Sequence, residues 1–248
     1  MDNSLLIACV GFLAQLIDGA LGMAYGTVSA AVLLALGVTP ANTSAAVHTA
    51  QIFTCAASGL SHIWHGNVLW PIFWRLVGPG VAGAAVGATI LVHLDQAAIK
   101  PWISAYLGGL GLFILYRVAR PNRIRRPAAA DKAAIPLGFV AATADSIGGG
   151  GWGPIATTTL VGRGHEPRFT VGSVNVAEFV VKTASAATFF VVLGVTHLEI
   201  VMPLVAGGII AAPFGGYLAR IIPARVLMLL IGTLVLALSA WQILRLVL

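Results

Sequence analysis

Two side chains of opposite charge lie four residues apart in an apolar part of the chain. Glu178 and Lys182 would share one face of a helix, with the glutamate on the N-terminal side, which is the favourable order. Asn175, three residues before Glu178, would extend the same stripe. Lys182 could attract an anion while Glu178 responds to protonation. An ion pair that only stabilises the helix is an equally good interpretation.

A second polar stripe, made of His48, Gln51 and Cys55, lies 127 residues before the first, and the two stripes correspond position by position. Because Gln51 stands opposite Glu178 and Cys55 opposite Lys182, we expect the stripe of the second half, with Glu178 and Lys182, to set charge recognition. His48 taken alone is more typical of a hydrogen-bonded packing histidine than of a ligand. His48, Cys55 and His62 are spaced by two helical turns each, too far apart for one metal ion to bridge, so no metal site is predicted.

Each stripe is preceded by an aspartate and a glycine-rich segment. Glycine weakens a helix by about 1 kcal/mol, so an unwound break is expected in each half, where backbone N–H groups could face a bound anion. Close helix packing through small residues is the alternative. The aspartates could cap the broken helix ends, or take part in protonation or cation binding. The candidate site residues at the two breaks are Asp18, Gly22, Gly26, Asp145, Gly149, Gly150 and Gly153.

These polar residues stand out against a very apolar composition. The 248 residues are 58% hydrophobic and 9% charged, with a mean hydropathy of +0.95. Soluble domains carry about 25% charged residues, so the composition predicts an all-α, polytopic integral membrane protein. A charge at bilayer depth costs several kcal/mol, and such residues usually face a cavity or a partner. The net charge is +6, and the basic residues flank the apolar spans. This placement indicates membrane orientation and not nucleic-acid binding.

Six stretches have the length of a membrane-spanning helix. They cover residues 41–64, 68–94 and 98–118 in the first half and 167–193, 198–219 and 224–246 in the second. Each half opens with two shorter apolar pieces, at residues 4–17 and 27–37 and at residues 135–144 and 154–161. Neither short piece is long enough to span alone, and the first pair together would make about 50 Å of helix. A re-entrant or broken-helix hairpin is therefore predicted at the start of each half.

The two halves are related in sequence, which predicts a first repeat at residues 1–119, a basic linker at 120–133 and a second repeat at 134–248. At an offset of 127, Asp18 falls on Asp145 and Pro40 on Pro167. Three spans per half would invert the second repeat. The side of the membrane that includes the linker would then hold eleven basic residues, and the other side would hold only Lys100 and Arg245. The eleven are Arg75, Arg117, Arg120, Arg123, Arg125, Arg126, Lys132, Arg163, Arg168, Arg220 and Arg225.

This charge bias predicts inverted-topology repeats with the linker in the cytoplasm and both termini on the outer side. The apolar outer face suits lipid, and it would equally suit a second subunit, so a homodimer stays open. The sequence contains no Ser/His/Asp set, no zinc-protease motif and no phosphate loop, so neither enzymatic chemistry nor a cofactor is expected.

The paired breaks also carry a family resemblance. The run QLIDGALGMAYG at residues 15–26, followed by VTPANTSAAVH at 38–48, resembles the TauE/SafE family of membrane transporters. The runs ADSIGGGGWGP at 144–154 and TVGSVNVAE at 170–178 look like the second copy of its motif. The resemblance covers nearly the whole chain. It implies a carrier of small sulfur-containing anions, such as sulfite, thiosulfate, sulfoacetate or related organosulfonates, in a bacterial-type cytoplasmic (inner) membrane.

The leading hypothesis is thus a secondary transporter of a small sulfur-containing or organic anion, driven by the proton gradient and working by alternating access. Its site is expected near the bilayer midplane, where the breaks meet the two stripes. A passive anion channel is one alternative, because half-helices also build channels. A membrane cation or metal carrier, or a membrane-embedded enzyme, is another, which the aspartates and His48 would serve. The sequence leaves the anion, the direction and the coupling ion undetermined.

Overall fold

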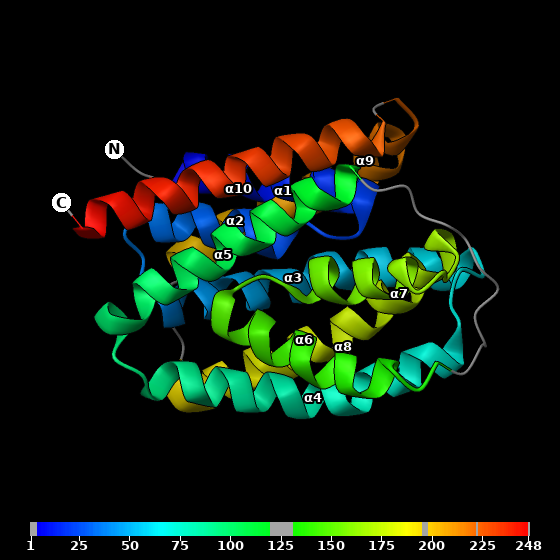
Figure 1. Ribbon diagram of the computed structural model, residues 1–248, viewed down its shortest axis with the longest axis horizontal. Coiled ribbons are helices and arrows are strands. Elements are labelled where there is room, and N and C mark those ends of the chain that lie inside the picture. The colour runs from blue at the N-terminus through cyan, green and yellow to red at the C-terminus, as the bar shows by residue number, and fades with distance from the viewer. Residues whose placement is uncertain (1–3, 120–130, 195–197, 222, 248) are drawn as a thin grey trace.

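The computed structural model describes residues 4–119, 131–194, 198–221 and 223–247, and these residues form helices. The long helices run roughly along one axis of the molecule and pack side by side (Figure 1). This arrangement confirms an all-α, multi-pass membrane protein. The predicted linker at residues 120–133 lies largely outside the described residues, which resume at Asp131.

Six long helices form where the apolar stretches predict them. The prediction is correct to within about three residues at each boundary. Helix α3 is more polar than the others, because it carries His48 and Gln51 together with several serines and threonines. The six helices are α3 (Pro40–Trp64), α4 (Trp70–His93), α5 (Gln96–Ala119), α8 (Pro167–Leu193), α9 (Leu198–Ile221) and α10 (Ala224–Val247).

Each half opens with a helix, a break and a shorter return. The first half has α1 (Ser4–Leu21) and α2 (Tyr25–Ala35). The second has α6 (Ala134–Gly148), then a wide π-type turn, η1 (Gly153–Thr157), that continues into α7 (Thr158–Gly162). The expectation that neither short piece could span alone is wrong for α1, which is long and apolar enough to cross a membrane. The helix runs through Asp18 and Gly19, and neither residue ends it.

Both breaks begin at a glycine in the left-handed region of backbone conformation. Gly22 has φ 66° and Gly149 has φ 71°, and they occupy equivalent positions of the two halves. Residues with a side chain adopt this conformation only at a cost of about 1–2 kcal/mol. The glycines therefore end α1 and α6 at matching points, three or four residues later than the aspartates alone suggested.

The two halves interlock. Helix α1 packs along α9 and α6 packs along α4, so the first helix of each hairpin lies against the second long helix of the other half. Helix α3 packs on α8, and α5 packs on α10. The two hairpin contacts match in detail. A Cβ on Gly11 would lie 2.5 Å from the Leu204 oxygen, and one on Gly138 would lie 2.5 Å from the Leu76 oxygen. The same close backbone approach thus recurs in both halves.

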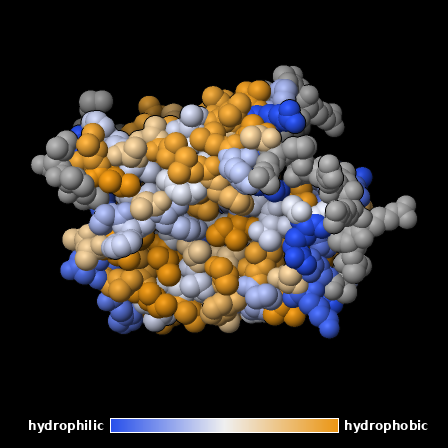
Figure 2. Space-filling view, in the orientation of Figure 1, coloured by the Kyte–Doolittle hydropathy of each residue, from blue (hydrophilic) through white to orange (hydrophobic). Residues whose placement is uncertain are grey.

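Hydrophilic residues gather at the two ends of the helix bundle (Figure 2). Helix α5 ends and α6 begins at the right-hand end of Figure 1, and α10 ends at the left. Figure 2 shows apolar residues over most of the middle of this face, with strongly hydrophilic residues toward the two ends. Exposed tryptophans lie close to helix ends, at Trp64, Trp70, Trp102 and Trp241. Tryptophan prefers membrane–water interfaces, so these positions favour a membrane normal along the long axis of the bundle.

Candidate functional site

The two helix breaks touch each other inside the bundle. A Cβ on Gly26 would lie 3.0 Å from the Gly149 oxygen. A Cβ on Gly150 would lie only 2.4 Å from the Thr27 nitrogen. Glycine is therefore needed at both positions so that the backbones of the two hairpins can meet, as the packing interpretation of these glycines predicted.

Two aspartates satisfy the open backbone groups at these breaks. Oδ1 of Asp18 accepts hydrogen bonds from the N–H groups of Ala24 (2.7 Å) and Tyr25 (3.1 Å). Oδ1 of Asp145 accepts one from the N–H of Trp152 at 3.0 Å. The capping role considered for both residues is confirmed. These three backbone donors are consequently occupied by carboxylates. That other N–H groups of the breaks face a bound anion stays a prediction.

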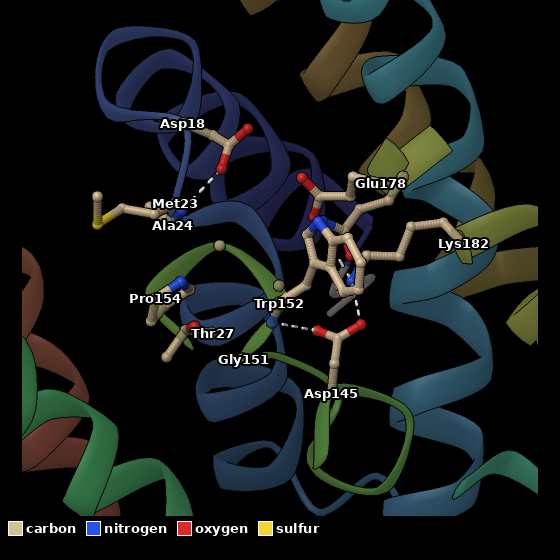
Figure 3. Close-up of a pocket in the computed structure, with 13 residues that line it drawn as sticks. Asp18, Met23, Ala24, Thr27, Asp145, Gly151, Trp152, Pro154, Glu178 and Lys182 are labelled. Atoms are coloured by element: carbon tan, nitrogen blue, oxygen red, sulfur yellow. Dashed lines mark hydrogen bonds and ion pairs between the residues drawn. The ribbon is translucent and has the colours of Figure 1, made fainter. Parts of the chain in front are cut away.

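The other oxygen of Asp145 connects the break to both polar stripes. Oδ2 lies 2.6 Å from Nζ of Lys182 and 3.0 Å from Nε2 of His48 (Figure 3 shows the lysine contact). Lys182 also lies 3.7 Å from Oε1 of Glu178, which accepts a hydrogen bond of 3.2 Å from Nε2 of Gln51. The predicted Glu178–Lys182 pair is therefore present, but the lysine has a closer partner in Asp145.

These groups are almost completely removed from solvent. The side chain of Lys182 is 1% exposed and that of His48 is 0% exposed. Charged groups this deep must be paired, because an uncompensated buried charge costs several kcal/mol. Lys182 reaches Asp145 on α6 from its place on α8, so the ion pair also ties the broken helix of the second half to a long helix.

A small cavity of about 10 Å³ lies between the breaks and the α8 stripe (Figure 3). That is about the volume needed for a single water. Seven of the predicted site residues line it, and these are Asp18, Gly26, Gln51, Asp145, Gly153, Glu178 and Lys182.

Five predicted site residues lie outside this cavity lining. His48 acts through Asp145, and Asn175 donates a hydrogen bond to Oγ of Ser58 at 3.0 Å. The other three are glycines of the breaks: Gly22, Gly149 and Gly150. In this conformation the glycines shape the backbone around the site rather than its inner surface.

The remaining lining residues were not among the predicted site residues: Met23, Ala24, Thr27, Gly151, Trp152 and Pro154. All six lie in or next to the two glycine-rich segments. Their position beside the predicted glycines could therefore have indicated them as site residues. Tyr106 on α5 was also missed; its hydroxyl donates a hydrogen bond to the Gly150 oxygen at 2.9 Å. No sequence pattern relates Tyr106 to the break, because 44 residues separate the two.

The cavity brings the carboxyl groups of Asp18, Asp145 and Glu178 together with one ammonium group, that of Lys182. The net charge of these groups depends on how many of the carboxyl groups are protonated. Within the described residues, no three histidine, cysteine, aspartate or glutamate side chains converge as ligands for a metal ion.

Comparison with known proteins identifies the family of the chain. The family model described as "Sulfite exporter TauE/SafE" matches residues 7–241. The chain is 42% identical over 247 residues to a Bacillus subtilis (strain 168) protein named "Probable membrane transporter protein YtnM", covering 97% of this chain and 82% of that protein. No solved structure matches the chain. The match spans both hairpins and all the long helices, and the chain therefore belongs to the TauE/SafE family of membrane transporters.

Proposed function

We propose that this membrane transporter carries a small sulfur-containing or organic anion, of the class of sulfite, thiosulfate, sulfoacetate or a related organosulfonate. It is a secondary transporter and not an enzyme, and the proton gradient drives it. The observation that carries this proposal is the Lys182 ammonium, which lines the cavity between the two helix breaks while almost completely buried. A buried cation at a break in the helices is suited to an anionic ligand.

The size of the cavity supports alternating access. A volume of about 10 Å³ is too small for any of these anions, so the site must widen to admit one. Substrate entry requires the hairpins and the α8 stripe to separate. The matched packing of α1 on α9 and of α6 on α4 supports inverted repeats, in which the same opening movement can occur toward either side.

The orientation proposed for the chain rests on its basic residues. Six described basic side chains lie near the helix ends that share the side of the bundle where α5 ends and α6 begins, whereas Lys100 and Arg245 lie near the start of α5 and the end of α10. By the positive-inside rule, the side where α5 ends faces the cytoplasm of a bacterial inner membrane, together with the linker. The six are Arg75, Arg117, Lys132, Arg163, Arg168 and Arg225.

A cation carrier is the second candidate, and the carboxylates around the cavity favour it. Asp18, Asp145 and Glu178 all line the cavity, against the one ammonium of Lys182. If all three are ionised, the site attracts cations. We prefer the anion because Asp18 is hydrogen-bonded by backbone N–H groups and Asp145 is held by Lys182 and His48, which leaves Glu178 as the remaining carboxylate of the cavity.

The test is uptake of ³⁵S-labelled sulfite and thiosulfate into proteoliposomes that contain purified protein. We expect the wild type to accumulate one of these anions when a pH difference is imposed, which a passive channel cannot do. Lys182→Gln is expected to abolish this flux, whereas Lys132→Gln, which changes an exposed lysine outside the cavity, retains it. Inhibition by divalent cations, with no effect of the sulfur anions, would instead identify a cation carrier.

A further inference from the structure

The ring of His48 has a protonation state that its hydrogen bonds determine. Nδ1 lies 2.7 Å from the backbone oxygen of Ser44, one helical turn earlier. A carbonyl oxygen can only accept a hydrogen bond, so Nδ1 carries a hydrogen. Helix α3 therefore holds His48 with Nδ1 as the donor.

The Ser44 hydroxyl gives the same result independently. Its oxygen lies 3.2 Å from Nδ1 and 2.6 Å from the backbone oxygen of Ser146. The hydroxyl has one hydrogen, which it must donate to the Ser146 oxygen, since that oxygen has none. Toward His48 the hydroxyl can then act only as an acceptor. Both contacts on this side of the ring thus require an Nδ1–H group.

The contact on the other side of the ring consequently needs one more proton. With Nδ1 protonated, a neutral His48 would point the lone pair of Nε2 at Oδ2 of Asp145, 3.0 Å away. A lone pair and a carboxylate oxygen repel each other at this distance. A proton between them removes the repulsion, either as imidazolium facing carboxylate or as neutral imidazole accepting from a carboxylic acid. The geometry therefore contains a bound proton shared by His48 and Asp145.

The surroundings give this proton an electrostatic role. Lys182 on α8 shares Oδ2 of Asp145, and Glu178 lies on the same helix. Asp18 on α1, Cys55 on α3 and Tyr106 on α5 are the other ionisable groups near the pair or its neighbours. With the shared proton, the set of His48, Asp145, Glu178 and Lys182 is neutral when Glu178 is ionised. Without it, the set carries one negative charge, which repels an anion from the cavity.

We propose that the His48–Asp145 pair binds the proton that is transported with the anion. The inference rests on the proposed function and adds to it the place where the coupling proton is held. Binding of the proton supplies the charge that lets an anion approach Lys182, and release of the proton expels the anion. Asn175, which replaces His48 in the second half, cannot titrate, so the transporter has one such pair and not two.

The first measurement uses only the wild-type protein. Thiosulfate stays fully ionised near neutral pH, so any proton taken up when it binds is bound by the protein. In weakly buffered detergent solution with a pH indicator, we expect about one proton to be taken up per thiosulfate bound, and the flux in proteoliposomes to depend on pH. Thiosulfate binding or transport with no proton movement would overturn the inference and leave the proposed function intact. Absence of binding and transport of any sulfur anion would contradict the proposed function itself.

The second measurement compares variants of two histidines, one within α3 and one directly after its C-terminal end. One unit of pH difference can drive about tenfold accumulation for one coupled proton. We expect His48→Gln to lose this accumulation and the pH dependence of thiosulfate exchange. His65→Gln is the matched control, because His65 makes the same Nδ1 bond to a carbonyl four residues earlier (2.8 Å, Ser61) but is exposed. Proton-driven accumulation that survives in His48→Gln would refute the pair as the proton site. If that variant does not fold, the proton uptake of the wild type decides.

Discussion

The two helix breaks have the same backbone design and different chemistry. In both, an aspartate accepts backbone N–H bonds across a glycine in the left-handed conformation, Asp18 at Gly22 and Asp145 at Gly149. The hydrogen bonds of Asp18 are made to backbone groups alone, whereas Asp145 also holds Lys182 and His48. The repeated sequence therefore builds the same backbone break in both halves. The few positions at which the halves differ give the second break its contacts with a lysine and a histidine.

The largest difference between the breaks should appear when each aspartate loses its charge. Asp145→Asn would leave the buried Lys182 without its closest partner, at a cost of about 3–5 kcal/mol. Asp18→Asn keeps an oxygen for the two N–H groups and should cost about 1 kcal/mol. Unfolding in mixed detergent micelles at neutral pH measures both. Equal losses of stability in the two variants would mean that the breaks are alike after all.

The contact between the breaks should be the next most sensitive feature. A methyl group at Gly150 would collide with the backbone of Thr27, so Gly150→Ala is expected to cost about 1–3 kcal/mol. Gly78→Ala is the matched control in a helix, because no atom lies within 4 Å of the added Cβ there. Better helix propensity should leave that control neutral or slightly more stable. The prediction fails if both variants unfold at the same detergent concentration.

Single hydroxyl groups that hold the breaks should have smaller and similar effects. Tyr106→Phe removes the hydrogen bond to Gly150, and Tyr25→Phe removes the one that Tyr25 donates to the Leu204 oxygen at 3.1 Å. Each should cost about 1 kcal/mol. The same unfolding assay applies. If Tyr106→Phe also slows anion exchange and Tyr25→Phe does not, the second break is the one that moves during transport.

The smallest effect is expected at the polar end of the second half. Asp131 lies 2.6 Å from Arg163 and 3.2 Å from His165, where the first half has the neutral residues Ser4, Leu36 and Val38. The hydrogen bond from Arg163 holds the pKa of Asp131 well below its usual range. The contribution of Asp131 is therefore present above about pH 4 and is lost as the pH falls further.

The measurement compares Asp131→Asn with the wild type across this pH range. At neutral pH the variant should be less stable by at most about 1 kcal/mol, because Arg163 is half exposed. Below about pH 4 the two proteins should converge. If the difference in stability instead grew on acidification, folding would raise the pKa of Asp131 and not lower it.

Much of the fold was predictable because it depends on local composition. A run of about 20 apolar residues must become a helix in lipid, and the ends of α8 follow from Pro167 at its start and Gly194 after its end. The position of the breaks was less predictable. Asp18 and Asp145 were expected to mark them, but both helices continue for one more turn, until Gly22 and Gly149. The aspartates accept hydrogen bonds from N–H groups six or seven residues later, across the break, and no pattern in the sequence predicts these contacts.

The sequence by itself determined the membrane class, the repeat, the approximate helices and the set of polar residues from which a site could be made. Only the tertiary structure decided how those residues pair. Lys182 has a visible partner one turn away in Glu178, yet its closer partner is Asp145, 37 residues earlier. His48 meets the same carboxylate from 97 residues away. Helix periodicity relates residues within a few turns, whereas these contacts depend on how α3, α6 and α8 pack together. The proton that we propose His48 and Asp145 share therefore depends on this packing.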